Sequence, residues 1–120
     1  MLRDAEMKSL SALSAEMKDL AARDRRLAPE EYKGGSLAIS NLGMFGIVSF
    51  DAVINPPHGA ILAVGAGKRQ PAIGGDGELT VATIMSVTLS VDHRVIDGAV
   101  GAELLGAIFD NLENPLVMLA

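Results

Sequence analysis

The sequence predicts an α/β fold in two layers, with helices packed on one side of a sheet. Apolar residues at spacings of three and four indicate an amphipathic helix over residues 2–24. Apolar, β-branched runs then predict strands, and a second helical pattern covers residues 97–112. At 120 residues the chain is expected to form one domain, large enough to bury roughly two-thirds of its unfolded surface.

The first helix has acid-before-base pairs four residues apart, Asp4 with Lys8 and Asp19 with Arg23. Its apolar stripe is too short for a coiled coil, so we expect one face to pack on a sheet. The stripe consists of Leu10, Leu13, Met17 and Leu20.

Pro29 and the Gly34–Gly35 pair end this section of the chain. The helix over residues 97–112 is apolar almost all round, which predicts burial on more than one side. Between the helices we expect a short strand at 36–40, a glycine-rich loop at 41–50, a buried strand at 60–64, a hairpin turn at 73–79 and a long strand at 80–91.

The charges are distributed unevenly along the chain. Residues 1–33 carry seven basic and seven acidic groups, whereas residues 34–120 carry three basic and eight acidic groups and supply the net charge of −5. Only 11 of those 87 later residues are charged, and such a charge-poor surface indicates interfaces between subunits. The acidic balance argues against nucleic acid as a partner.

No apolar run approaches the ~18 residues that a membrane-spanning helix needs, and no signal peptide is recognisable at the N-terminus. The chain contains no cysteine, which removes disulfides, cysteine–zinc sites and thiol nucleophiles together. The absence of cysteine fits a cytosolic type of compartment.

The strongest chemical signal is His93, which lies between a predicted strand and a predicted helix, with Asp97 four residues later. Histidine, with an unperturbed pKa of ~6.5, exchanges protons near neutrality, and acyl transfer to a thiol or hydroxyl needs such a base. Two plainer interpretations stay open on spacing alone. Asp97 could serve only as an N-cap, and His93 could be a structural histidine at a strand end.

Other candidate sites are weak. Gly65–Gly67 follows a strand as a dinucleotide loop would, but the third glycine is missing and Pro71 interrupts the expected helix. The two carboxylates and one imidazole near residue 93 make a poor metal site, and His58 lies far away in a proline-rich loop, so no metal is expected. Met44 and Phe45 are expected in the core, with a channel wall or a subunit contact as alternatives.

Several segments, in this order, resemble the dihydrolipoamide acyltransferases of 2-oxo-acid dehydrogenase complexes. Ser86–Gly98, with its Asp-His-Arg-Val-Ile-Asp-Gly motif, resembles the active-site segment of that family. The stretch Ser-Asn-Leu-Gly-Met-Phe-Gly is most similar to the acetyl branch of that family. The other matching segments are Ala38–Gly46, Val53–Pro57, Ala60–Gly65 and Leu112–Leu119.

The resemblance implies a chloramphenicol acetyltransferase-like fold with a mixed sheet. It also implies that His93 is the general base for the thiol of CoA or dihydrolipoamide, that Ser40 stabilises the oxyanion, and that Asp97 holds local geometry and pairs with an arginine. CoA is then a substrate, lipoamide is carried on a separate domain, and no metal is involved. The resemblance identifies no residue that binds CoA.

By the same resemblance, residues 1–120 form the C-terminal half of the catalytic domain, which leaves exposed sheet edges and half a cleft. The expected partners are copies of the chain in a trimer or larger core, a lipoyl domain and the other subunits of the complex, in the bacterial cytoplasm or the mitochondrial matrix. The alternatives are a scaffold module that assembles without turnover and an unrelated α/β domain with a capped helix.

Overall fold

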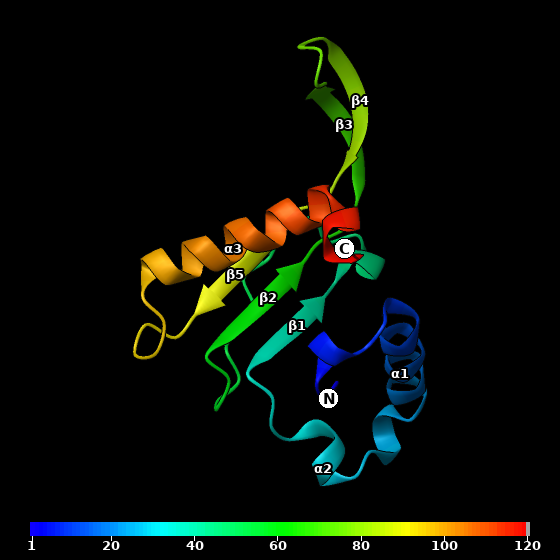
Figure 1. Cartoon of the computed structure of the whole chain (residues 1–120), viewed down its shortest axis with the longest axis vertical. Coiled ribbons are helices and arrows are strands. Elements are labelled where there is room, and N and C mark those ends of the chain that lie inside the picture. The colour runs from blue at the N-terminus through cyan, green and yellow to red at the C-terminus, as the bar shows by residue number, and fades with distance from the viewer. Residues whose placement is uncertain (120) are drawn as a thin grey trace. The chain divides into compact units, whose positions relative to one another are not determined.

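The computed structural model describes residues 1–119 and divides the chain into two compact units. The first unit comprises Met1–Ser36, and the second begins at Leu37 (Figure 1). Among the residues described, no helix is both long and apolar enough to cross a membrane.

The first unit is helical, and its main helix is shorter than predicted. The α-helix α1 runs over Leu10–Ala22 instead of starting near residue 2. Ser9 caps it, because the Ser9 hydroxyl accepts a hydrogen bond from the amide of Ala12 at 3.2 Å. Upstream, Asp4 has φ of 48° and Lys8 is extended, which separates a short 3-10 helix from α1. The remaining elements are η1 (Ala5–Met7), η2 (Asp24–Arg26) and α2 (Pro29–Tyr32).

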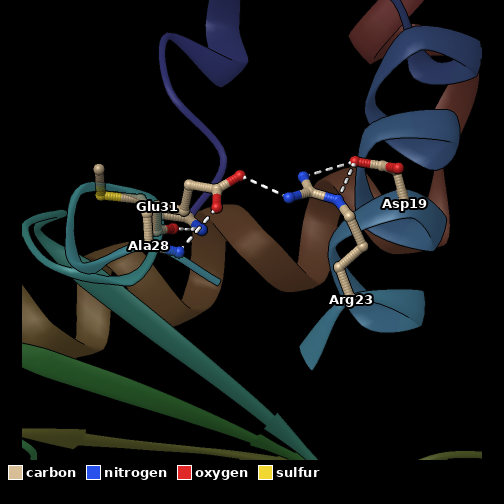
Figure 2. A network of polar contacts seen from close by, with 5 residues as sticks. Asp19, Arg23, Ala28 and Glu31 are labelled. Carbon is tan, nitrogen blue, oxygen red and sulfur yellow. Dashed lines mark hydrogen bonds and ion pairs between the residues drawn. The ribbon is translucent and has the colours of Figure 1, made fainter. Parts of the chain in front are cut away.

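Arg23 links the end of α1 to α2 (Figure 2). Its guanidinium lies 2.7 Å from the carboxylate of Asp19, as predicted, and 2.9 Å from that of Glu31. Glu31 also accepts a hydrogen bond from the amide of Ala28 at 2.8 Å. That amide and Arg23 lower the pKa of the Glu31 carboxyl. The predicted pairing of Lys8 is wrong, since this ammonium group bonds Glu16 at 2.6 Å instead of Asp4.

The second unit contains a three-stranded mixed sheet in the order β1–β2–β5. Strand β1 (Leu37–Asn41) pairs in parallel with β2 (Ala60–Val64), which pairs antiparallel with β5 (Val87–Val91). Strand β2 agrees with the predicted strand at 60–64, and its two neighbours leave it central. Both β1 and β5 are edge strands in this sheet.

The long strand predicted at 80–91 is in fact two strands in different sheets. Its first part, β4 (Leu79–Ile84), forms a hairpin with β3 (Lys68–Ile73), which was not predicted. The hairpin extends away from the three-stranded sheet (Figure 1). The amide of Gly65 donates to the carbonyl of Ser86 at 3.0 Å, where the chain leaves the hairpin and enters β5. The predicted turn between the two hairpin strands is confirmed.

Helix α3 (Gly98–Glu113) confirms the predicted second helix and lies along β5 (Figure 1). The close approach occurs at Gly101, where an added Cβ would lie 3.3 Å from Cγ1 of Val91. The predicted burial of α3 on several sides is wrong in the single chain, because Gly101 is its only buried residue. A short helix, η4 (Pro115–Leu119), follows α3.

The buried apolar core is small and is confined to one strand. Among residues 1–119 the buried apolar side chains are those of Ala60–Ala63 in β2. Many large apolar side chains of the second unit remain exposed, including those of Ile39, Met44, Phe45, Val53, Ile73, Leu79, Phe109 and Leu116. Met44 and Phe45 were expected in the core, and their exposure of 82% and 71% contradicts that prediction.

A close backbone crossing fixes the loop between β1 and β2 against the end of β2. The amide of Ala66 donates to the carbonyl of Ile47 at 2.7 Å. At the neighbouring Gly65, an added Cβ would lie 1.9 Å from the carbonyl oxygen of Val48. Only glycine therefore fits at this crossing.

Candidate active site

His93 lies in the turn that joins β5 to α3, and its side chain is exposed. The turn starts at Asp92, whose amide donates to the carbonyl of Gly59 at 2.8 Å and so extends the pairing of β5 with β2. The carbonyl of Asp92 in turn accepts hydrogen bonds from the amides of Val95 (3.0 Å) and Ile96 (2.9 Å). The predicted position of His93, after a strand and before a helix, is confirmed.

The residues on either side of His93 form an ion pair. Nη2 of Arg94 lies 2.7 Å from Oδ2 of Asp92, and Nε lies 3.0 Å from Oδ1. The backbone amide of Arg94 also donates to Oδ1 at 3.0 Å. The hydrogen bonds from the Arg94 side chain, followed by the one from its amide, lower the pKa of the Asp92 carboxyl to about 2. Asp92 was considered from the sequence only as one carboxylate of a poor metal site, and its pairing with Arg94 was not predicted.

This pKa predicts how the turn responds to acid. The Asp92 carboxyl has a lower pKa in the folded chain, about 2, than its ordinary value of 3.8. The stabilisation from the ion pair is therefore fully present above pH 4, and it is lost as the pH falls through 2. Carboxyl NMR titration should give a midpoint near pH 2 for Asp92 in the wild-type chain. In the Arg94→Ala chain the midpoint should move up toward 4, and an unchanged midpoint would contradict the pairing.

Asp97 is the N-cap of α3. Its Oδ1 accepts a hydrogen bond from the amide of Val100 at 2.9 Å, and its backbone is extended. This is the plainer of the two roles considered for Asp97, and it also fixes where the helix begins after His93. The implied pairing with an arginine is not found within residues 1–119, where Arg94 pairs with Asp92.

Ser40 is half-buried near the end of β1. It pairs in register with Ala63, which pairs with Thr88 of β5, so these three side chains lie on one face of the sheet. Val91 is three residues beyond Thr88 and therefore lies on the other face, which α3 covers. Ser40 thus faces away from α3.

The sheet places Ser40 and His93 at opposite ends. Ser40 is level with Thr88 of β5. Asp92 lies four residues beyond Thr88, on the extension of β5, and His93 is the next residue. At ~3.3 Å per residue along a strand and ~4.8 Å between strands, the two residues lie roughly 15 to 20 Å apart. A single chain therefore does not bring the hydroxyl and the imidazole together.

The remaining candidates do not add to the site. His58 lies directly before Gly59, at the same end of the sheet as His93, so the expectation that it lies far from His93 is wrong. Gly65–Gly67 leads into β3 and not into a helix, in agreement with the rejection of a dinucleotide loop. Within the described part of the chain, no group of three histidine or acidic side chains could hold a metal ion.

The mixed sheet, with a helix on one face and a histidine turn between β5 and α3, is an α/β fold of the chloramphenicol acetyltransferase-like type, as predicted. The family model for the catalytic domain of 2-oxoacid dehydrogenases acyltransferase matches residues 1–120. The chain belongs to this family.

Its relatives include the dihydrolipoyllysine-residue acetyltransferase components of the pyruvate dehydrogenase complexes of Rhizobium meliloti and Zymomonas mobilis. They are 56% and 54% identical to this chain over 98% and 99% of its length. The chain spans only 27% of the length of each of these two proteins.

Solved structures agree with the fold. Dihydrolipoamide acetyltransferase of Azotobacter vinelandii aligns with a TM-score of 0.84 and 35% identity, covering 94% of this chain and 47% of that one. A chain from the cubic core of a pyruvate dehydrogenase multienzyme complex also aligns with a TM-score of 0.84, at 34% identity and with the same coverage.

Proposed function

We propose that the chain carries the C-terminal half of an acetyltransferase catalytic domain, which transfers an acetyl group between the thiols of dihydrolipoamide and CoA. The support is membership of the acyltransferase family and identity above 50% to acetyltransferase components of pyruvate dehydrogenase complexes. Both thiol compounds are substrates in this reaction, and the lipoyl group would arrive on a separate domain.

The proposed chemistry uses one base and one hydrogen-bond donor. His93 removes the proton from the attacking thiol, and the thiolate sulfur forms a bond to the thioester carbonyl carbon. The hydroxyl of Ser40 donates a hydrogen bond to the oxyanion that develops on the carbonyl oxygen. The intermediate collapses by breaking the other carbon–sulfur bond, and the departing thiolate takes the proton back from His93. Asp97 acts indirectly, by fixing the start of α3.

The Azotobacter vinelandii enzyme supports these assignments. Its structural and enzymatic study concerns a serine, a histidine and an asparagine in the catalytic mechanism, with the asparagine four residues after the histidine. Asp97 follows His93 by the same four residues. Asparagine and aspartate can both act as the N-cap at this position, since both side chains accept the same hydrogen bond.

Ser40 and His93 lie at opposite ends of one sheet, and this observation bears most directly on how the site is assembled. If both residues serve one reaction, each site must combine Ser40 of one chain with His93 of another. A symmetric assembly brings such residues together, because the same contact repeats around its axis. A related chain forms the cubic core of a multienzyme complex, which supports a trimer or larger symmetric core here.

Mixing two inactive variants tests this arrangement. Ser40→Ala and His93→Ala should each lower acetyl transfer from acetyl-CoA to dihydrolipoamide. When the two variants are unfolded, mixed in equal amounts and refolded together, about a quarter of the sites should combine an intact serine with an intact histidine by random assembly. The mixture should therefore recover about a quarter of the wild-type turnover.

Wild-type chain that has been refolded in the same way is the control, together with each variant refolded alone. If the mixture has only the summed activity of the two variants, the serine and the histidine do not come from different chains. Recovery without co-refolding would show that chains exchange between assemblies in the folded state, and it would still support a shared site.

A second candidate function is a scaffold module that assembles but does not catalyse acetyl transfer. The observation that favours it is the large exposed apolar surface of a chain with few buried apolar side chains. Light scattering followed by turnover on the same sample separates the candidates. Assembly with turnover supports the enzyme, and assembly without turnover supports the scaffold.

The relatives support a proposal for the location. They include bacterial proteins, such as that of Rhizobium meliloti, and a Dictyostelium discoideum component described as mitochondrial, which is 49% identical to this chain. We accordingly propose the bacterial cytoplasm or the mitochondrial matrix, where the other subunits of such a complex would be its partners.

A further inference from the structure

The ion pair between Asp92 and Arg94 closes a ring around a single residue, His93. The Arg94 side chain makes bonds of 3.0 and 2.7 Å to the two carboxylate oxygens, and the Arg94 amide makes a third bond of 3.0 Å. The backbone on both sides of His93 is therefore tied to the same carboxylate. The imidazole of a residue enclosed by such a ring can adopt fewer orientations than one on an open turn.

The ring is fixed to the most deeply buried part of the sheet. The amide of Asp92 bonds the carbonyl of Gly59 at 2.8 Å, and the next residue, Ala60, is only 3% exposed. Close packing adds to this bond, since a Cβ added to Gly59 would lie 3.3 Å from a methyl of Val95 and 3.5 Å from one of Ile96. The turn around His93 is thus anchored to Gly59, the residue that precedes the buried strand β2.

A surface ion pair with no role is the plainer interpretation, since the Arg94 side chain is 85% exposed and exposed pairs add little stability. Two features distinguish this pair. It is bidentate, and its partners are two residues apart, so that forming it orders little additional chain. The hydrogen bonds from Arg94 also lower the pKa of the Asp92 carboxyl. Such a pair can orient a neighbour even where its contribution to the stability of the whole chain is small.

We propose that Asp92 and Arg94 are positioning residues, which hold the His93 imidazole in the direction needed to reach a thiol. This inference rests on the proposed role of His93 as the general base. Neither residue needs to touch the substrate, because both act through the backbone of the turn. Arginine is required for the bidentate geometry, and a lysine could supply the charge but not both hydrogen bonds.

Kinetics of three variants test the proposal. Arg94→Ala and Asp92→Asn should lower kcat by about 10- to 100-fold, since small misplacements of a catalytic group cost this much. KM for CoA and for dihydrolipoamide should change by less than about threefold, because residues that act only through the backbone of the turn contribute nothing to substrate binding. Arg94→Lys should retain an intermediate kcat. Arg26→Ala, which removes an exposed arginine of η2, is the matched control and should retain wild-type kcat.

A second measurement does not depend on turnover. NMR three-bond couplings report the χ1 rotamer of His93, which should be single in the wild-type chain and averaged in Arg94→Ala. Wild-type couplings in Arg94→Ala would overturn the proposal, whether or not kcat falls, and so would an unchanged kcat in an active chain. An inactive wild-type chain would count against the proposed function alone, and the couplings would still decide whether the pair positions His93.

Discussion

Replacing His93 with alanine should lower acetyl transfer between acetyl-CoA and dihydrolipoamide by about 10²- to 10⁴-fold, the contribution that a general base typically makes. The His93 side chain is exposed in the single chain, so its removal should leave the fold and the assembly intact. Turnover and light scattering on the same sample check both parts of this prediction.

His58→Gln is the matched control for this variant. His58 is the other histidine of the chain and lies at the same end of the sheet, in the loop that precedes β2. This variant should retain wild-type turnover. If His93→Ala retains wild-type turnover, or if only His58→Gln loses it, the assignment of the base to His93 is wrong.

Replacing Gly65 with alanine should destabilise the chain by about 3 kcal/mol or more, at the upper end of what overpacking costs. The new Cβ would lie 1.9 Å from the carbonyl oxygen and 2.6 Å from the carbonyl carbon of Val48. These are backbone atoms, so no side-chain rotation can relieve the clash. The two segments must separate, which breaks the bond from the Ala66 amide to the Ile47 carbonyl. Urea unfolding followed by circular dichroism measures the loss.

Gly106→Ala is the control, because an added Cβ on this residue of α3 meets nothing within 4 Å. Alanine in a helix interior is favoured over glycine, so this variant should gain about 0.5 to 1 kcal/mol. Equal urea midpoints for Gly65→Ala and the wild type would show that the crossing at Val48 is absent in solution.

Local patterns predicted much of the second unit correctly. The apolar run at Ala60–Val64 forms the central strand, since such a run is suited to burial on both faces. The apolar pattern after Asp97 identified the helix, and the N-cap role of Asp97 was one of the two interpretations that the sequence left open. The glycines after Ile73 identified the hairpin turn. In each case the information lies within a few neighbouring residues.

The errors occurred where distant residues decide the structure. Residues 80–91 look like one strand because the apolar, β-branched pattern passes Met85 and Ser86 without a turn signal. At the break, the amide of Gly65 donates to the carbonyl of Ser86, and the local pattern does not contain this contact with a distant residue. The apolar surface of α3 suggested burial, but one chain does not supply enough surface to cover it.

The same distinction applies to the candidate site. The position of His93 between a predicted strand and helix made it a candidate base, and the family resemblance added Ser40. Only the register of β1, β2 and β5 shows that one sheet separates them. The pairing of Asp92 with Arg94 was overlooked for a different reason. On a helix, an acid and a base two residues apart do not face each other, and here they meet because the chain turns between them.

Within residues 1–119, the buried apolar side chains are confined to Ala60–Ala63 of β2, and this has a thermodynamic consequence. Apolar burial is the main force that opposes the conformational entropy of the unfolded chain, and the single chain supplies little of it. Most of that burial must come from contacts with other polypeptide, so folding and association become one equilibrium. The melting temperature should then rise with protein concentration, and dilution alone should unfold the chain.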